Sequence, residues 1–464
     1  MNPFATVAET AAAVRKKTIS ARELAEQTFQ RIDAVNPTLN AIVGNLKETA
    51  LAHAVEADQA LAEGRVLGPL HGVPITIKES FAYRGTPNTW GLPDLAHAMS
   101  PRTAIAVERL ESAGAIVVGK TNVPVMLADW QSDNPLYGTT SNPWDVSRTP
   151  GGSTGGGAAA IAAGLGALTM GSDLSGSLRI PAHFCGVYAH KPSLNLIGME
   201  GLQPGPWDGS PGPPMDLAVV GPMARDARDL TLALDVLSGP NSDEQKAWTW
   251  RMPAPRRTRL RDFRIGYIVE DPVAPIASDV RAVYENLVSA VSKTGAAMQQ
   301  GWPAGVDVRA AAETYGYLLM SFVTADLTGK RPSTFDHARW LRETMQRLAF
   351  RSMWQKHFKS CDVFLLPASF TAAFPHDRSQ PIEKRVIETP EGPRPYVQNS
   401  SYWISMASLS GLPATVAPIG FTDSGLPVGI QILAPMWEDA TSIEFAALLS
   451  EAVGGFVAPP VSPK

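Results

Sequence analysis

Charged side chains are scarce in this chain. Only 18% of its 464 residues are Asp, Glu, Lys or Arg, against roughly 25% charged residues in an average soluble domain. The formal net charge is −4, so there is no general basic field that would attract a nucleic acid. Apolar types make up 44% of the residues, which excludes an intrinsically disordered chain. The composition therefore predicts a folded protein with a large buried core.

Cysteine and long apolar runs are also scarce. Cys185 and Cys361 are the two cysteines and lie far apart in the sequence, which argues against a disulfide scaffold and fits a reducing compartment. The longest nearly apolar run extends from Ala158 to Met170. A bilayer span needs about 20 such residues, so we interpret this run as a buried helix. The first residues also lack the pattern of a signal peptide, and a cytoplasmic protein with no membrane partner is expected.

Glycine and proline are abundant, with 39 residues of each, and they divide the chain into short segments. Residues 1–64 have helical patterns, and Ser20 with Glu23 forms a capping box for a helix that we expect to end at Asn36–Pro37. After residue 70, short apolar runs with little polar alternation indicate strands that are covered on both faces. These runs occupy residues 73–78, 115–119, 362–367, 413–420 and 427–435.

Ala- and Leu-rich helical stretches separate several of these runs. The last two runs enclose the turn TDSGLP and predict an antiparallel hairpin. We therefore predict an α/β protein with a single large mixed β-sheet between layers of α-helices.

Three segments do not follow this pattern. Residues 201–216 contain five prolines and four glycines, and residues 252–264 contain five arginines; we interpret the first as an irregular insert and the second as a solvated loop. Residues 305–360 are helical in pattern and unusually aromatic, so they belong either to the core or to a lid over an apolar substrate. The aromatic residues concerned are Tyr315, Tyr317, Phe322, Trp340, Phe350 and Trp354.

Two clusters of glycine and serine carry the main chemical signal. They are TPGGSTGGG at 149–157 and MGSDLSGSLRIP at 170–181. A glycine-rich turn that enters a helix collects unpaired N–H groups, which can hold a phosphate or an oxyanion. A phosphate-binding Walker loop requires a lysine after its last glycine, and no lysine follows Gly157. The first cluster also lacks the Gly-x-Gly-x-x-Gly pattern of a dinucleotide-binding fingerprint. The sequence therefore argues against nucleotide binding.

The first cluster also matches Gly-x-Ser-x-Gly around Ser153, the nucleophile elbow of serine hydrolases. Such an enzyme needs a downstream histidine, and His337, His357 and His376 are the candidates. A lysine could be the base instead, because Lys78 ends the apolar run Val-Pro-Ile-Thr-Ile-Lys. Burial would lower the pKa of that lysine. From the run alone, however, a strand-end lysine that reaches solvent is the simpler interpretation.

Several motifs together resemble the amidase signature family. The resemblance runs in order from about residue 5 to residue 452, so one domain over 1–464 is expected. It would have N-terminal helices at 1–64, a signature core at 65–240, a variable helical region at 241–360 that shapes the pocket, and C-terminal strands and a helix at 361–455. The motifs are GPLHGVPITIKESF, GKTNVP, YGTTSNPWDVSRTPGGSTGGGAAAIAAG, GSDLSGSLRIPAHFCGV, GPMARDARDL and LPVGIQIL.

This resemblance implies the amidase signature fold and a Ser–cis-Ser–Lys triad. The family lysine falls on Lys78, the bridging serine in a cis peptide after Gly152 falls on Ser153, and the nucleophile falls on Ser177. The implied oxyanion hole consists of the backbone N–H groups of Leu174, Ser175, Gly176 and Ser177. Asp173, Arg179, Gly152 and Thr154 are expected to support these loops.

The chain departs from the family pattern at three positions. Thr154 replaces the second serine of a Ser-Ser pair and keeps a hydroxyl, Ser175 replaces a glycine beside the nucleophile, and Val125 replaces an acidic residue. The departure at Val125 indicates a subgroup. At Ser175, the backbone of the expected oxyanion hole must accommodate an additional side chain.

We therefore expect an amidohydrolase that cleaves linear C–N acyl bonds without metal or cofactor. Its substrates would be small amides, anilides, aryl carbamates or esters, as in aryl-acylamidase and urethanase-type members, and a homodimer is a further expectation. Three alternatives stay open: a subunit that amidates a charged tRNA with partner chains, an esterase of the α/β-hydrolase type with Ser153 as nucleophile, and a non-catalytic binding protein.

Overall fold

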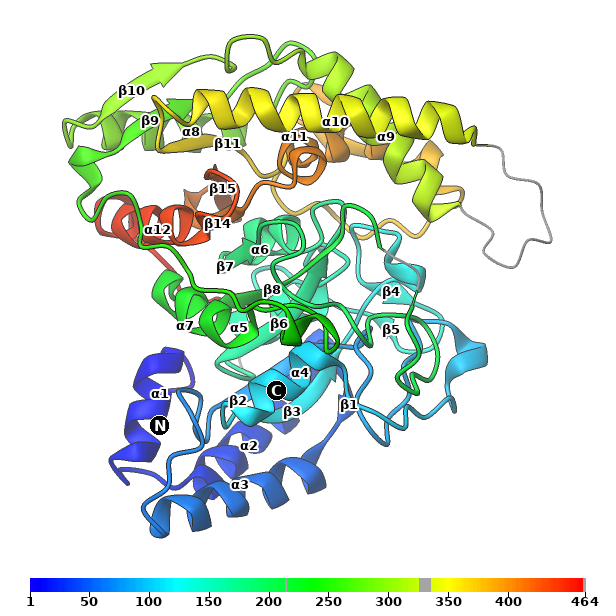
Figure 1. Ribbon diagram of the computed structural model, residues 1–464, viewed down its shortest axis with the longest axis vertical. Coiled ribbons are helices and arrows are strands. Elements are labelled where there is room, and N and C mark those ends of the chain that lie inside the picture. Colours follow the sequence, from blue (N-terminus) through cyan, green and yellow to red (C-terminus); the bar gives the residue numbers. More distant parts are fainter. Residues whose placement is uncertain (213–214, 325–334, 462–464) are drawn as a thin grey trace.

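The computed structural model describes residues 1–212, 215–324 and 335–461 (Figure 1). Eleven strands form a mixed sheet in the order β1-β3-β2-β6-β8-β7-β14-β15-β11-β9-β10. Two small sheets pair β4 with β5 and β12 with β13. The strand bounds are β1 Ile42–Asn45, β2 Pro74–Lys78, β3 Ile116–Thr121, β4 Asp133–Asn134, β5 Gly138–Thr139, β6 Leu168–Asp173, β7 Tyr188–Lys191, β8 Val219–Ala224, β9 Arg264–Tyr267, β10 Ala297–Gln300, β11 Val363–Pro367, β12 Val386–Thr389, β13 Gly392–Pro395, β14 Ala414–Phe421 and β15 Pro427–Leu433.

Helices cover both faces of the sheet. As a result, five of its strands are buried along their whole length, namely β2, β3, β6, β8 and β15. Helices α5 and α6 pack against each other and against the sheet, as do α7 and α12. Helices α9, α10 and α11 form a separate group beyond β15 (Figure 1). The helix bounds are α1 Val7–Arg15, α2 Ala21–Leu39, α3 Lys47–Ala62, α4 Ile105–Ser112, α5 Gly155–Ala162, α6 Arg179–Cys185, α7 Ala227–Leu237, α8 Ser278–Ser292, α9 Val308–Val323, α10 His337–His357, α11 Tyr396–Ser410 and α12 Asp439–Val453.

The predicted α/β class with a mixed sheet is confirmed. Each of the five predicted apolar runs forms a strand, namely β2, β3, β11, β14 and β15, and the last two pair as the expected antiparallel hairpin. The parallel pairs β2–β3 and β2–β6 form one region of the sheet, while β6–β8 and β7–β14 are antiparallel. The other six strands of this sheet were not predicted; two of them, β7 and β8, lie among the glycine- and proline-rich motifs.

Two predicted helix limits are wrong. The run Ala158 to Met170 is not one helix: α5 ends at Ala162 and β6 begins at Leu168. Gly164 between them has a φ of +74°, a value that ends a helix. None of the helices in the described ranges is long and apolar enough to cross a bilayer.

Helix α2 also continues beyond the predicted end, to Leu39, with Pro37 inside its last turn. The side chain of Asn36 completes this helix end by accepting hydrogen bonds from the N–H groups of Ala41, at 2.9 Å, and of Ile42, at 2.8 Å. The segment that leaves the helix is therefore tied back to its last turn.

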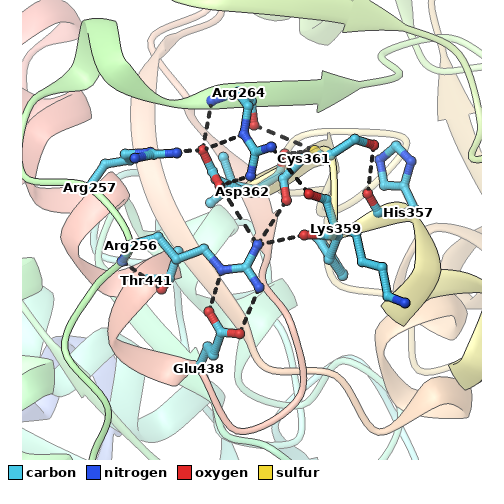
Figure 2. Close-up of polar contacts among 12 residues, drawn as sticks. Arg256, Arg257, Arg264, His357, Lys359, Cys361, Asp362, Glu438 and Thr441 are labelled. Atoms are coloured by element: carbon cyan, nitrogen blue, oxygen red, sulfur yellow. Dashed lines mark hydrogen bonds and ion pairs between the residues drawn. The ribbon is translucent and has the colours of Figure 1, made fainter.

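The interpretation of residues 252–264 as a solvated loop holds for Arg259 and Arg261, which are exposed, but the other three arginines are only partly exposed and bind distant partners. Arg257 and Arg264 both contact the buried carboxylate of Asp362 at the start of β11, at 3.2 Å and 2.6 Å (Figure 2). Arg256 pairs with Glu438 and donates to the carbonyl oxygen of Phe358. These contacts tie the segment to partners more than 90 residues away in the chain, and short-range sequence patterns do not reveal such partners.

The region 241–360 contains helices α8, α9 and α10, and it also contributes β9 and β10 to the sheet. Within it, Phe350 and Trp354 are buried in the core. Residues 325–334 of this region lie outside the described residues, as do 213–214 of the irregular 201–216 insert. In the described part of that insert, Trp207 is buried and forms its anchor.

Candidate active site

Lys78 lies at the end of β2 and is completely buried, so it is not the strand-end lysine reaching solvent that its sequence run favoured. Because β2 and β6 are parallel, their carboxyl ends lie at the same edge of the sheet. The Lys78 ammonium therefore faces the end of β6, and Nζ donates to Ser172 Oγ at 3.0 Å and to Ser153 Oγ at 2.7 Å. Burial lowers the pKa of Lys78 to about 7, although the Asp173 carboxylate opposes this shift.

Ser153 connects this lysine to Ser177. The Ser153 hydroxyl donates to Ser177 Oγ at 2.9 Å, and the peptide bond between Gly152 and Ser153 is cis, as the resemblance implied. A side chain at Gly152 would collide with the carbonyl oxygen of Asp129, so this turn requires a glycine. The three predicted residues thus form one continuous chain of hydrogen bonds, which runs from the buried Lys78 to Ser177, a residue that is 7% exposed.

Thr154 links the two glycine-serine segments to each other. Its N–H donates to the carbonyl oxygen of Ser177 at 3.1 Å, and its hydroxyl donates to the carbonyl oxygen of Ser172 at 3.3 Å. The hydroxyl kept at this position therefore contacts the end of β6. Sequence reasoning singled out Thr154 as a support residue, and its two bonds agree with that hypothesis.

The residues 174–178, which we call the 174–178 loop, turn from β6 into α6. Asp173 accepts hydrogen bonds across this turn from the N–H groups of Gly176, at 2.9 Å, and of Leu178, at 3.1 Å. The Arg179 guanidinium binds the same carboxylate at 2.9 Å, and both side chains are fully buried. Burial raises the pKa of Asp173, but the Arg179 charge and these hydrogen bonds outweigh burial and hold it at about 2.

Arg179 also bonds to the segment that completes the sheet. Its guanidinium donates to Gln431 Oε1 on β15 at 2.6 Å and to Ser408 Oγ on α11 at 2.7 Å. The Asp173–Arg179 pair therefore joins the 174–178 loop to β15 and α11, more than 220 residues away.

We expect Arg179→Met to lower the free energy of unfolding by about 3–5 kcal/mol, because it leaves the Asp173 carboxylate buried without its partner. The midpoint of urea unfolding measures the change. Arg22→Met is the control, since the exposed ion pair of Arg22 with Glu26 is worth less than about 1 kcal/mol. Equal shifts in the two variants would contradict this role of Arg179.

One of the four predicted oxyanion-hole donors has another partner in the structure. The Gly176 N–H is directed to Asp173, at a residue whose φ is +81°, so this amide supports the loop. The N–H groups of Leu174, Ser175 and Ser177 donate to no protein acceptor within the described ranges. Predicting this division from sequence was not possible, because it depends on how the carboxylate of Asp173 reaches across the turn.

Sequence reasoning missed three residues that contact this site. Ser172 shares the Lys78 ammonium with Ser153. The indole N–H of Trp130 donates to the carbonyl oxygen of Ser175 at 2.7 Å, and the hydroxyl of Tyr315 donates to Ser175 Oγ at 2.7 Å. Tyr315 belongs to the aromatic set noted in the sequence, but only the fold shows which of those aromatic residues reaches the site.

The histidines that an elbow-type esterase would need do not contact Ser153. In the described residues, the Ser153 hydroxyl bonds to Lys78 and to Ser177. His357 packs against Phe364 of β11, and the ring nitrogens of His376 have no hydrogen-bond partner within the described ranges. The geometry at Ser153 therefore favours lysine over histidine as the base.

Comparison with known proteins places this arrangement in a family. A family model described as Amidase matches residues 23–330 and 323–443. This chain belongs to the amidase signature family. It is accordingly a hydrolase of carbon–nitrogen bonds in amides, and the family expectation from the sequence is confirmed.

Curated relatives within the family have different names. The chain is 32% identical to an indoleacetamide hydrolase of Bradyrhizobium diazoefficiens, over 96% of this chain and 86% of the relative. It is also 32% identical to an acylamidase of Rhodococcus erythropolis, over 95% and 93% of the two chains. A glutamyl-tRNA(Gln) amidotransferase subunit of Thermosynechococcus vestitus is 30% identical over 93% of this chain and 94% of that protein.

Solved structures of other amide hydrolases share the fold. A bacterial aryl acylamidase superposes with a TM-score of 0.81 at 22% identity, covering 97% of this chain and 96% of that one. A 6-aminohexanoate cyclic dimer hydrolase superposes with a TM-score of 0.81 at 24% identity, covering 99% of both chains. These likenesses confirm the amidase signature fold.

Proposed function

We propose that the chain hydrolyses linear amides through an acyl-enzyme on Ser177, with Ser153 as the proton relay and Lys78 as the base. The observation that carries this proposal is the unbroken chain of hydrogen bonds Lys78–Ser153–Ser177, at 2.7 Å and 2.9 Å. A hydroxyl both donates and accepts, and its hydrogen can rotate. With Lys78 neutral, the same distances let Ser177 donate to Ser153 and Ser153 donate to the lysine lone pair.

The first half of the reaction follows from this arrangement. Ser177 Oγ attacks the substrate carbonyl carbon while its proton passes to Ser153 Oγ, and the proton of Ser153 passes to Lys78 Nζ. We propose that the N–H groups of Leu174, Ser175 and Ser177 hold the oxyanion that forms. Donors of this kind are each worth on the order of 3–4 kcal/mol of transition-state stabilisation.

The second half reverses the relay. The tetrahedral intermediate collapses as Ser153 protonates the leaving nitrogen and regains a proton from Lys78, which makes the amine a competent leaving group. Water then attacks the acyl-enzyme and gives one proton back through Ser153 to Lys78. The second tetrahedral intermediate then collapses, and the same proton returns from Lys78 through Ser153 to Ser177 Oγ. This transfer restores the Ser177 hydroxyl and releases the carboxylic acid.

The proposed substrates are uncharged aryl amides and anilides, with aryl carbamates and esters as further members. The half-buried indole of Trp130 lies beside the 174–178 loop and packs edge-on against Tyr396, with 5.4 Å between ring centroids. An indole this close to the proposed nucleophile would favour flat, apolar groups. The names of two relatives, indoleacetamide hydrolase and acylamidase, agree with this substrate class.

The proposed setting is the cytoplasm, with a small-molecule substrate and no nucleic-acid partner. Both cysteines are unpaired and buried, which fits a reducing compartment. The expected homodimer stays a prediction. The subunit that amidates a charged tRNA stays an alternative because of the amidotransferase relative.

A parallel assay of four substrate types tests the proposed function. We expect the purified chain to hydrolyse an acyl anilide and an aryl ester at least about tenfold faster than it releases ammonia from glutamine, because the proposed site selects apolar acyl groups. An aryl carbamate completes the panel. Ammonia release from glutamine alone, with no turnover of the anilide, would instead favour the amidotransferase alternative.

A further inference from the structure

Ser175 is held by two aromatic side chains, one at its carbonyl oxygen and one at its hydroxyl. Its carbonyl oxygen accepts from the indole N–H of Trp130, and its hydroxyl accepts from Tyr315, both at 2.7 Å. Tyr315 lies on α9, 140 residues beyond Ser175, and is 2% exposed. Burial raises the pKa of Tyr315 above its ordinary value, so the phenol stays a neutral donor over the whole working range of pH.

The two bonds act on different parts of the 174–178 loop. The peptide group between Ser175 and Gly176 is already fixed at both ends, because its C=O accepts from Trp130 and its N–H donates to Asp173. The Ser175 N–H belongs to the preceding peptide group, which has no such pair of anchors within the described ranges. Apart from the bond at its carbonyl oxygen, Ser175 is held through its side chain, whose hydroxyl accepts from Tyr315.

We propose that Tyr315 is a positioning residue that orients the oxyanion-binding N–H of Ser175 by holding the Ser175 hydroxyl. The serine that replaces the family glycine beside the nucleophile is, in this view, the attachment point of α9. A glycine offers no side chain to hold, so the loop and the helix would move independently. Helix α9 therefore supports the 174–178 loop in addition to packing against the core.

This inference rests on the proposed function, and its test measures kcat and KM of an acyl anilide for Tyr315→Phe, Ser175→Ala and the double variant. A misplaced oxyanion donor weakens only the transition state. We therefore expect each single variant to lower kcat about 10- to 30-fold while KM stays within about twofold. Because Tyr315 acts through Ser175, the double variant should lose no more than either single variant.

Tyr317→Phe is the matched control, since this tyrosine lies on the same helix and donates to the carbonyl oxygen of Asp336 instead. It should keep the wild-type kcat. All rates are divided by the fraction of enzyme that a fluorophosphonate labels, which removes any loss due to misfolding. The position of the acidic limb of the pH profile should not change in Tyr315→Phe, because Lys78 keeps its contacts.

The possible outcomes separate this inference from the proposed function. A wild-type kcat in Tyr315→Phe, a change in KM alone, or additive losses in the double variant would each overturn the role of Tyr315, while wild-type hydrolysis leaves the proposed function standing. If the wild-type chain neither hydrolyses the anilide nor reacts with the fluorophosphonate, the proposed function itself fails.

Discussion

Ser177→Ala is expected to abolish amide hydrolysis, with a fall in kcat of at least about 10⁴-fold. The variant lacks the oxygen that forms the acyl-enzyme, while Lys78 and Ser153 keep their mutual bond at 2.7 Å. Covalent labelling by a fluorophosphonate should disappear as well. Mass spectrometry of the intact protein after incubation with the probe measures the labelling, and initial rates of anilide hydrolysis measure kcat.

The same experiment separates Ser177 from the serine of the elbow motif. Ser153→Ala removes the relay but not the nucleophile, so this variant should still be labelled at Ser177, only more slowly. Ser352→Ala, which changes a serine of α10, is the control and should behave as the wild type. A label found on Ser153, or full labelling of Ser177→Ala, would show that the elbow-type hypothesis is the correct one.

Lys78→Met should reduce kcat by about 10³-fold or more, because the relay then has no base. In the wild type, kcat/KM should rise tenfold per pH unit up to a limb near pH 7 and level off above it. The sign follows from the chemistry: the pKa of Lys78 is lowered to about 7, and below that value the lysine is protonated and cannot accept the proton of Ser153. A pH profile of kcat/KM for the anilide measures this limb.

Lys191→Met is a demanding control for this assignment. Lys191 is also fully buried with a pKa lowered to about 7, but its Nζ donates to the carbonyl oxygen of Pro192 and not to a catalytic serine. The enzyme that remains folded in this variant should keep the acidic limb. Loss of the limb in Lys191→Met, or a Lys78→Met variant that keeps wild-type kcat, would assign the base elsewhere.

Local patterns in the sequence predicted much of the fold, and the resemblance to the amidase signature family supplied the residues of the proposed triad. The capping box at Ser20 is present with both of its bonds, and the hairpin β14–β15 follows from two apolar runs around a turn. Lys78, Ser153 and Ser177 are brought together as the resemblance implied. For the capping box and the hairpin, the signal lies within a short segment of the chain, where propensity and spacing decide the structure.

Features that depend on distant partners were not predictable. The apolar run of β2 does not show whether Lys78 reaches solvent, because its burial depends on strands β3 and β6 on either side. The sequence does not show that Arg257 and Arg264 bind the buried carboxylate of Asp362, because Asp362 lies about 100 residues further along the chain. Likewise, the bond between Tyr315 and Ser175 joins two segments 140 residues apart.

The burial of Lys78 also links folding to protons. Between pH 7 and 10.5, the unfolded chain binds a proton at this lysine that the folded chain does not, because the pKa of Lys78 is lowered from 10.5 to about 7 on folding. The contribution of this group to conformational stability therefore rises with pH over that interval, by up to about 1.4 kcal/mol per pH unit, and is least favourable below pH 7. The rest of the fold must compensate for the cost of burying this lysine. The residue on which the proposed chemistry depends is therefore one that is costly for the fold to bury.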